Sequence, residues 1–320
     1  MGVYSRILRS PKVAVLLAAT TLGRLPFGIN GLAVLLFLRE QTGSFAVAGL
    51  VVGALALGSA AGAPLAARMV DRRGPAMLMP LALSHAAAVL AIWALGSAGA
   101  PGVVLAAVAL LAGASFPPSG SVLRTRWPEL LRDEALVRGA YALDSALIEV
   151  SFVAGPLITA ATMAFAGPQV ALGIAAVLVV VGTALFVLEL PDCRVEEHEP
   201  GRAGLLGAFG DPAIRAIALT TLPAGFCIGT VEVAIPAFTE ELGEAELAGI
   251  LLALWSASSL VGGLLFGIRR PRGLVETYLA TAILLPLGCL PLLTASSPAA
   301  MAGLVVLAGL PIAPMIASRN

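Results

Sequence analysis

Residues 62–74, which read GAPLAARMVDRRG, decide the fold predicted for this chain. A long apolar run ends in this stretch in a tight cluster of charged side chains, and Pro75 opens the next apolar run. Both flanking runs exceed the roughly 20 residues that a helix needs to cross a bilayer. We therefore predict a short charged loop held at one face of a membrane. Its candidate functional residues are Gly62, Arg68, Asp71, Arg72, Arg73 and Gly74.

The composition is that of an integral membrane protein. Of the 320 residues, 59% are hydrophobic and 12% are charged, whereas an average soluble domain is about 25% charged. The formal net charge is zero, so nucleic-acid binding, which needs a basic surface, is not expected. Cys193, Cys227 and Cys289 form no CxxC pair. We therefore predict no disulfide framework, no metal site and no cofactor.

Ten membrane-spanning helices are predicted from the lengths of the apolar runs. A β-barrel is not expected, because its strands would be runs of about ten residues with alternating polarity. The predicted fold class is therefore an all-α helical bundle in the membrane. The expected spans are residues 13–38, 45–69, 76–97, 101–123, 139–163, 168–190, 214–238, 246–268, 275–295 and 298–318.

The positions of Lys and Arg predict the orientation in the membrane. Of these nineteen residues, only Arg39 falls in a loop on one face, Arg24 lies inside the first span, and the other seventeen fall at the opposite face. Loops on the cytoplasmic side of a membrane carry an excess of Lys and Arg. We therefore expect a multi-pass protein of the cell membrane with a cytoplasmic N-terminus.

A linker and an internal repeat predict two halves. Residues 191–213 are rich in charge, Pro and Gly, so we expect a cytoplasmic linker between an N-terminal half, 1–190, and an incomplete C-terminal half, 214–320. Shifting the chain by 200 residues places Glu40 on Glu240 and Gly62 on Gly262. The expected arrangement is six spans plus four, as parallel repeats, which is a pattern of secondary transporters.

Two short motifs resemble those of the major facilitator superfamily. Asp71-Arg72-Arg73-Gly74 matches the D-R-x-G core of the family's loop between helices 2 and 3, although Ala67 replaces its leading glycine. Gly155-Pro156 is similar to the Gly-Pro of the family's helix 5. The resemblance implies that Asp71 latches a cytoplasmic gate by meeting the start of helix 11. Members normally have twelve helices, and ten are predicted here.

Ionisable residues inside the predicted spans are candidates for function. A charge at mid-bilayer costs roughly 2.5 kcal/mol or more, so such residues usually face a cavity or a partner. One interpretation is a cavity in which Glu149 or Glu232 takes up a proton and Arg24 binds an anion. The alternative is a structural Arg24–Glu149 ion pair, and Asp144 is expected at a gate or interface. The candidate cavity residues are Arg24, Asn30, Asp144, Glu149 and Glu232.

Residues 124–138, which read RTRWPELLRDEALVR, are interpreted as a single cytoplasmic helix. Its apolar side chains could lie along the membrane while Arg and Glu face water. A solvated linker helix is the simpler alternative. Either version places this segment outside the spans.

The predicted function is secondary transport by alternating access. Proton-coupled efflux of a small organic molecule is the specific hypothesis, and the expected partners are that substrate, protons and the lipid bilayer. Metabolite uptake by the same fold is the close alternative, and a truncated membrane protein that does not transport is another. An enzyme is not expected, because no nucleophile–base or metal constellation stands out among the intramembrane residues.

Overall fold

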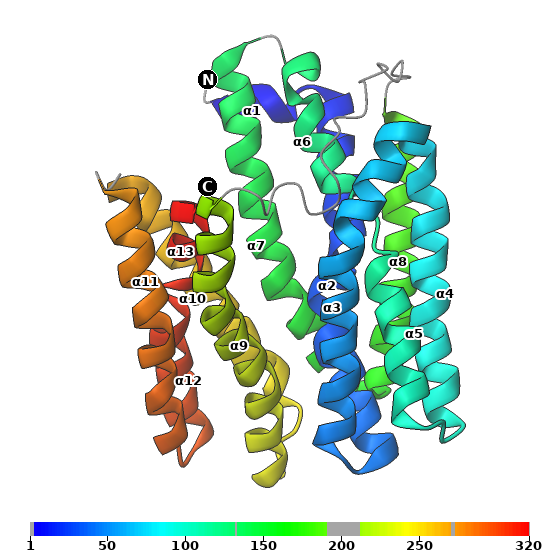
Figure 1. The fold of residues 1–320 in the computed structure, drawn as a ribbon, viewed down its shortest axis with the longest axis vertical. Coiled ribbons are helices and arrows are strands. Elements are labelled where there is room, and N and C mark those ends of the chain that lie inside the picture. The colour runs from blue at the N-terminus through cyan, green and yellow to red at the C-terminus, as the bar shows by residue number, and fades with distance from the viewer. Residues whose placement is uncertain (1–2, 132, 191–211, 270–272, 320) are drawn as a thin grey trace. The chain divides into compact units, whose positions relative to one another are not determined.

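The computed structural model describes residues 3–131, 133–190, 212–269 and 273–319. Throughout these ranges the secondary structure is helical, without a strand (Figure 1). Ten helical segments in the described ranges are long and apolar enough to cross a membrane. The prediction of an all-α bundle with ten spans is therefore confirmed. The predicted linker, 191–213, lies outside the described residues except for its last two, which begin a helix.

The first of two compact units covers Met1–Glu197 and holds six of the spans. Its central helix is α2, which packs against α3, α7 and α8. In a second group, α4 packs against α5 and α8, and α5 also packs against α3. The helices of this unit are α1 (Val3–Leu8), α2 (Pro11–Thr42), α3 (Phe45–Arg73), α4 (Leu78–Ser97), α5 (Gly102–Ala114), α6 (Ser119–Leu130), α7 (Glu134–Phe165) and α8 (Pro168–Glu189).

Local sequence explains where the long helices begin and end. Gly43 ends α2 with a φ of 66°, a conformation that glycine adopts without steric cost. The Ser44 hydroxyl then accepts a hydrogen bond from the Val47 amide at 3.3 Å and caps α3. Asp133 caps α7 in the same way, accepting from the Ala135 amide at 2.8 Å. Short capped turns of this kind hold neighbouring spans antiparallel.

The charged stretch that opened the sequence analysis is helical, so its prediction as a loop is wrong. The α3 helix continues through Arg73, and the turn consists of Gly74 and the single 3-10 turn Pro75–Met77. Arg72 and Arg73 occupy the last turn of α3, where positive side chains interact favourably with the helix dipole. The chain leaves the helix at Gly74, whose φ is 85°.

The fourth span is broken in its middle. Phe116 lies between α5 and α6, directly before Pro117 and Pro118. Two adjacent prolines lack two backbone donors and cannot continue a helix. The prediction of a single helix over residues 124–138 is wrong, because this segment belongs to two helices. Its first half continues α6, and its second half begins α7 after the Asp133 cap.

The second unit covers His198–Asn320 and holds four spans. Within it, α10 packs against α9, α12 and α13, and α11 packs against α9, α12 and α13. Its last span, like the fourth, is broken near a proline, here Pro311. The elements of this unit are α9 (Pro212–Glu241), α10 (Leu247–Arg269), α11 (Leu274–Cys289), the 3-10 helix Leu290–Thr294, α12 (Pro298–Gly309) and α13 (Ile312–Arg319).

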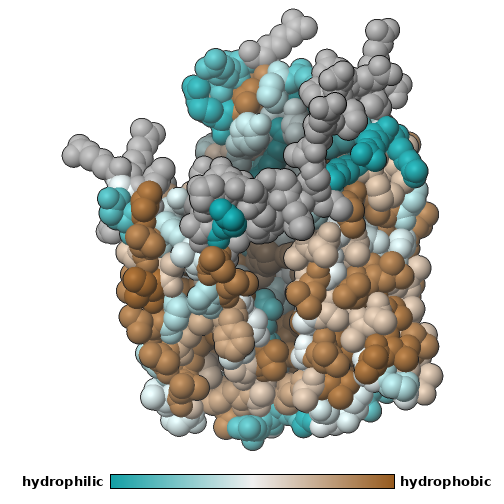
Figure 2. Space-filling model, in the orientation of Figure 1, coloured by the Kyte–Doolittle hydropathy of each residue, from teal (hydrophilic) through white to brown (hydrophobic). Residues whose placement is uncertain are grey.

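Apolar side chains form the outer surface of the helices. Figure 2 shows hydrophobic surface over α3, α4 and α5 and, separately, over α11 and α12, with hydrophilic surface at the end of α3. Leu57 of α3 and Val103 of α5 are 67% and 75% exposed. Such surfaces are suited to lipid rather than water.

The internal repeat appears as two equivalent helix contacts. A Cβ added at Gly62 of α3 would overlap the backbone of Ala114 at the end of α5, so these two backbones touch. In the second unit, a Cβ added at Gly262 of α10 would overlap the Leu310 backbone at the end of α12. Small residues permit this close approach inside membranes. Gly62, a candidate residue of the gating loop that also lies within the expected span 45–69, is thus a buried helix-packing residue.

In each of these two contacts, the partner helix also contributes a glycine. Gly113 of α5 faces the carbonyl oxygen of Leu55, and Gly309 of α12 faces that of Trp255. Leu55 and Trp255 are separated by the same 200 residues as Gly62 and Gly262. We name these two backbone contacts, α3 with α5 and α10 with α12, the glycine seams.

Candidate functional site

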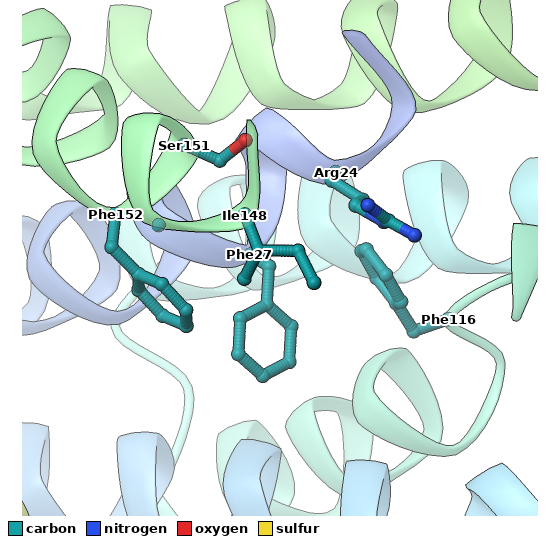
Figure 3. A pocket seen from close by; sticks show the side chains of 7 residues that line it. Arg24, Phe27, Phe116, Ile148, Ser151 and Phe152 are labelled. Carbon is teal, nitrogen blue, oxygen red and sulfur yellow. The ribbon is translucent and has the colours of Figure 1, made fainter. Parts of the chain in front are cut away.

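A cavity of about 190 Å³ lies within the first unit, between α2, α7 and the break in the fourth span. The α2 helix contributes one positively charged and one aromatic side chain, and α7 contributes two apolar side chains and one hydroxyl (Figure 3). Phe116 lies on the wall within the break before Pro117 and Pro118, two residues after α5 ends at Ala114. The lining residues are Arg24, Phe27, Gly28, Phe116, Ile148, Ser151 and Phe152.

Three phenylalanine rings form one wall of this cavity. Phe27 lies between the other two rings in Figure 3. Its ring centroid is 5.6 Å from that of Phe116 and 5.7 Å from that of Phe152, with interplanar angles of 65° and 80°. Edge-to-face contacts of this kind are the preferred geometry of aromatic pairs. The wall is therefore apolar and its rings support one another.

Arg24 is held at the cavity by Asp144 of α7. Its Nη1 donates to Asp144 Oδ1 at 2.5 Å, and Arg124 Nε of α6 donates to Oδ2 at 2.6 Å. The Asp144 side chain is 1% exposed, whereas those of Arg24 and Arg124 are 14% and 41% exposed. One buried carboxylate thus joins three helices through two charge-assisted hydrogen bonds. We call these three residues the ionic triad.

The triad corrects the predicted partner of Arg24. The alternative in the sequence analysis paired Arg24 with Glu149, and the structure pairs it with Asp144. These two acidic residues lie five positions apart on α7, which is about 140° around a helix. They therefore face different directions, and Asp144 is the one that contacts Arg24 of α2. Asp144 is itself buried, and its expected role at a gate or interface stays a prediction.

Glycines create the space that the triad and the cavity need. A Cβ at Gly120 of α6 would overlap the Arg24 guanidinium, so this glycine is what admits the side chain. A Cβ at Gly155 of α7 would overlap the backbone of Gly28 of α2. The backbones of α2 and α7 therefore touch at Gly155, which belongs to the predicted Gly-Pro motif. This contact lies one helical turn from the cavity residues Ser151 and Phe152.

Asn30 and His85 form a separate buried pair. The His85 Nδ1 lies 2.7 Å from the Ala112 carbonyl oxygen, so it carries the proton and donates. Its Nε2 then accepts from Asn30 Nδ2 at 3.0 Å. The His85 ring also meets the Phe116 ring edge-to-face at 5.0 Å. Both side chains are at most 3% exposed, so Asn30 supports the cavity wall from behind rather than lining it.

Replacing Asn30 by Ala is expected to lower the free energy of unfolding by about 1 kcal/mol. The change leaves His85 Nε2 without its donor, and it also removes the Asn30 Oδ1, which has no partner among the described residues. The measurement is the unfolding of purified protein in detergent. Thr21→Ala is the matched control on α2, because its hydroxyl bonds only to the Leu17 carbonyl of its own helix in the described structure. Equal effects of the two changes would contradict the pairing.

The remaining candidates lie apart from the cavity lining. Glu149 is half-buried on α7, and Glu232 is exposed on α9 of the second unit. Asp71, Arg72 and Arg73 are exposed at the end of α3. Arg68 is half-buried on the same helix, and Gly74 is buried in the turn after it.

The sequence prediction misses seven residues of the site. It assigns Arg124 to an interfacial segment and does not single out the lining residues Phe27, Gly28, Phe116, Ile148, Ser151 and Phe152. The signal for Arg124 was the double proline, which marks the start of a separate helix six residues before it. An aromatic residue in an apolar span carries no equivalent signal, since lipid-facing and cavity-facing positions have the same composition.

Comparison with known proteins gives two matches. The sequence matches the family model of the Major Facilitator Superfamily over residues 16–319. A protein described as an uncharacterized MFS-type transporter, y4rN, from Sinorhizobium fredii (strain NBRC 101917 / NGR234) is 28% identical over 280 residues. That alignment covers 82% of this chain and 68% of the relative.

Proposed function

Because the chain belongs to the Major Facilitator Superfamily, and is therefore a secondary transporter in the membrane, we propose that it exports a small organic molecule in exchange for protons. The observation that carries this proposal is the cavity in the first unit, which combines a charged anchor, Arg24, with a wall of three aromatic rings. Small-molecule sites typically have this composition, mostly apolar with a few placed polar groups. Gly155-Pro156 on α7 is a partial match to the Gly-Pro feature of the family's helix 5, without the longer glycine series that is typical of its drug/proton antiporters.

We assign proton coupling to the acidic residues outside the triad. Both oxygens of Asp144 accept hydrogen bonds from guanidinium groups, so this carboxylate has a structural task. Glu149 follows the lining residue Ile148 directly, and Glu232 lies within the first span of the second unit. An acidic residue placed within a membrane span is a functional candidate by default.

The gate and the orientation are further parts of the proposal. The exposed residues Asp71, Arg72 and Arg73 at the end of α3 are suited to a cytoplasmic gate, since an anionic side chain can meet the positive N-terminal end of another helix. The excess of Lys and Arg on that side supports a cytoplasmic N-terminus in the cell membrane. In this arrangement the two halves, 1–190 and 214–320, move about the linker between them.

Replacing Glu149 by Gln is expected to lower proton movement coupled to transport by about tenfold or more. Proteoliposomes with entrapped pyranine report the proton movement while organic acids, amines and neutral solutes are supplied across an imposed pH gradient. Glu134→Gln is the matched control on α7, because that side chain is 92% exposed and outside the apolar part of the span. We expect the control to behave as the unaltered protein.

Three outcomes separate the parts of this proposal. Unchanged proton movement in the Glu149→Gln protein would reject Glu149 as the coupling residue. Proton movement in the same direction as the solute would assign uptake instead of efflux. A failure of every solute to move protons in the unaltered protein would reject proton coupling altogether.

A further inference from the structure

The charges of the ionic triad do not balance. The ionic triad contains two guanidinium groups and one carboxylate, which leaves one positive charge in excess. Each oxygen of Asp144 already accepts from one arginine. Arg124 is 41% exposed and is not a lining residue, whereas Arg24 is 14% exposed and lines the cavity. The positive charge that the cavity presents to a ligand is therefore that of Arg24.

Arg24 retains donors for a ligand. A guanidinium group has five N–H donors in a planar fork that fits a carboxylate. In the described part of the chain, Arg24 donates one hydrogen bond, from Nη1 to Asp144. This bond fixes the plane of the guanidinium group while the other donors are uncommitted. The side chain is thus oriented in advance of binding, which reduces the entropy lost on association.

The rest of the cavity is apolar. The Phe27, Phe116 and Phe152 rings and the Ile148 side chain form its wall. The hydroxyl of Ser151 donates to the Leu147 carbonyl of its own helix at 2.9 Å. The polar contacts of a ligand therefore come mainly from Arg24, where Figure 3 shows the guanidinium group beside Phe116. A matching ligand has one charged end and an apolar body.

Charge and size narrow the ligand further. Aromatic faces attract cations, but here a cation would also meet the guanidinium group at the same cavity. The volume of about 190 Å³ is smaller than the roughly 300–1,000 Å³ of drug-sized sites. We propose that the cavity binds a carboxylate with a single aromatic ring, its anionic end on Arg24 and its ring against Phe27, Phe116 and Phe152. This inference names the substrate class of the proposed transporter and rests on that function for the role of the cavity.

Three probes of one shape test the charge. Benzoate, benzamide and benzylamine share the ring and are expected to carry one negative, no and one positive charge at neutral pH. Binding to the purified protein is measured by calorimetry in detergent, without a membrane gradient. We expect benzoate to bind about tenfold or more tightly than benzamide, and benzylamine to bind most weakly, because a charge-assisted pair is about twice as strong as a neutral one.

Two phenylalanines on one helix test the ring contact. Phe152→Ala is expected to weaken benzoate binding by about three- to tenfold, the range that one aromatic pair contributes. Phe165→Ala is the matched control on α7, because Phe165 is 90% exposed and does not line the cavity. Arg24→Lys retains the charge and loses the planar fork, so it should weaken benzoate binding while leaving benzamide binding nearly unchanged.

The results distinguish this inference from the proposed function. Equal binding of the three probes, tighter binding of benzylamine, no binding of any of them, or equal effects of Phe152→Ala and Phe165→Ala would each overturn the assignment of an aromatic carboxylate. The transport proposal would survive such a result, provided that other solutes still move protons in proteoliposomes. Benzoate binding without any solute-driven proton movement would support the binding site and reject proton-coupled export.

Discussion

Replacing Asp144 by Asn is expected to lower the free energy of unfolding by about 3–5 kcal/mol. The change removes the carboxylate that holds two guanidinium groups at 2.5 and 2.6 Å. Arg124 is 41% exposed and can be hydrated, so most of the loss comes from Arg24, which is 14% exposed. A buried charge without a partner is among the most destabilising single defects in a protein.

A double variant separates the lost pair from a general effect of the substitution. Arg24→Gln combined with Asp144→Asn removes both charges of the buried pair, so we expect it to unfold less readily than Asp144→Asn alone. Asp133→Asn is the control carboxylate: its contact with Arg6 is 3.7 Å long and both side chains are 47% exposed. Exposed pairs contribute little, and Asn is as good a helix cap as Asp. An effect of Asp133→Asn equal to that of Asp144→Asn would contradict the role of the triad.

Replacing Gly155 by Ala is expected to cost about 1–3 kcal/mol of stability and to disrupt the cavity. The added methyl group would overlap the backbone of Gly28, which cannot move aside as a flexible side chain would. The two helices must then separate, and α2 and α7 carry six of the seven lining residues as well as the Arg24–Asp144 pair. The measurements are unfolding in detergent and benzoate binding.

Gly31→Ala on α2 is the matched control for this change. A Cβ at Gly31 would meet no atom within 4 Å, and alanine favours a helix more than glycine does. We expect Gly31→Ala to be neutral or slightly stabilising and to leave benzoate binding unchanged. If both glycine changes destabilise the protein equally, the close approach of α2 and α7 does not explain the effect.

The helices were predictable because span length depends on the sequence alone. A run of about 20 apolar residues must be helical in a bilayer, whatever its neighbours are. The errors concern local helix ends. The charged stretch before Gly74 remains helical, because residues 65–73 contain neither glycine nor proline. The double proline at 117–118 ends a helix inside a span, which run length does not detect.

The site was predictable only in part. Arg24 and Asp144 stood out because charge within an apolar span needs a partner. Their pairing depends on how α2 and α7 are rotated about their axes, which packing decides and composition does not. The same reason hid the bond between Asn30 and His85, which lie on α2 and α4. Phe27, Phe116 and Phe152 were hidden because an apolar ring satisfies the same pattern on either face of a helix.

The glycine seams have a mechanical consequence. Interdigitated side chains can change rotamer as two helices slide, whereas touching backbones have no such freedom. The α3 and α5 helices, which meet at Gly62 and Ala114, must therefore tilt as one rod. Phe116 follows the end of this rod by two residues. Asp71 lies near the C-terminal end of α3. A tilt of α3 would therefore displace the Phe116 ring in the aromatic wall of the cavity.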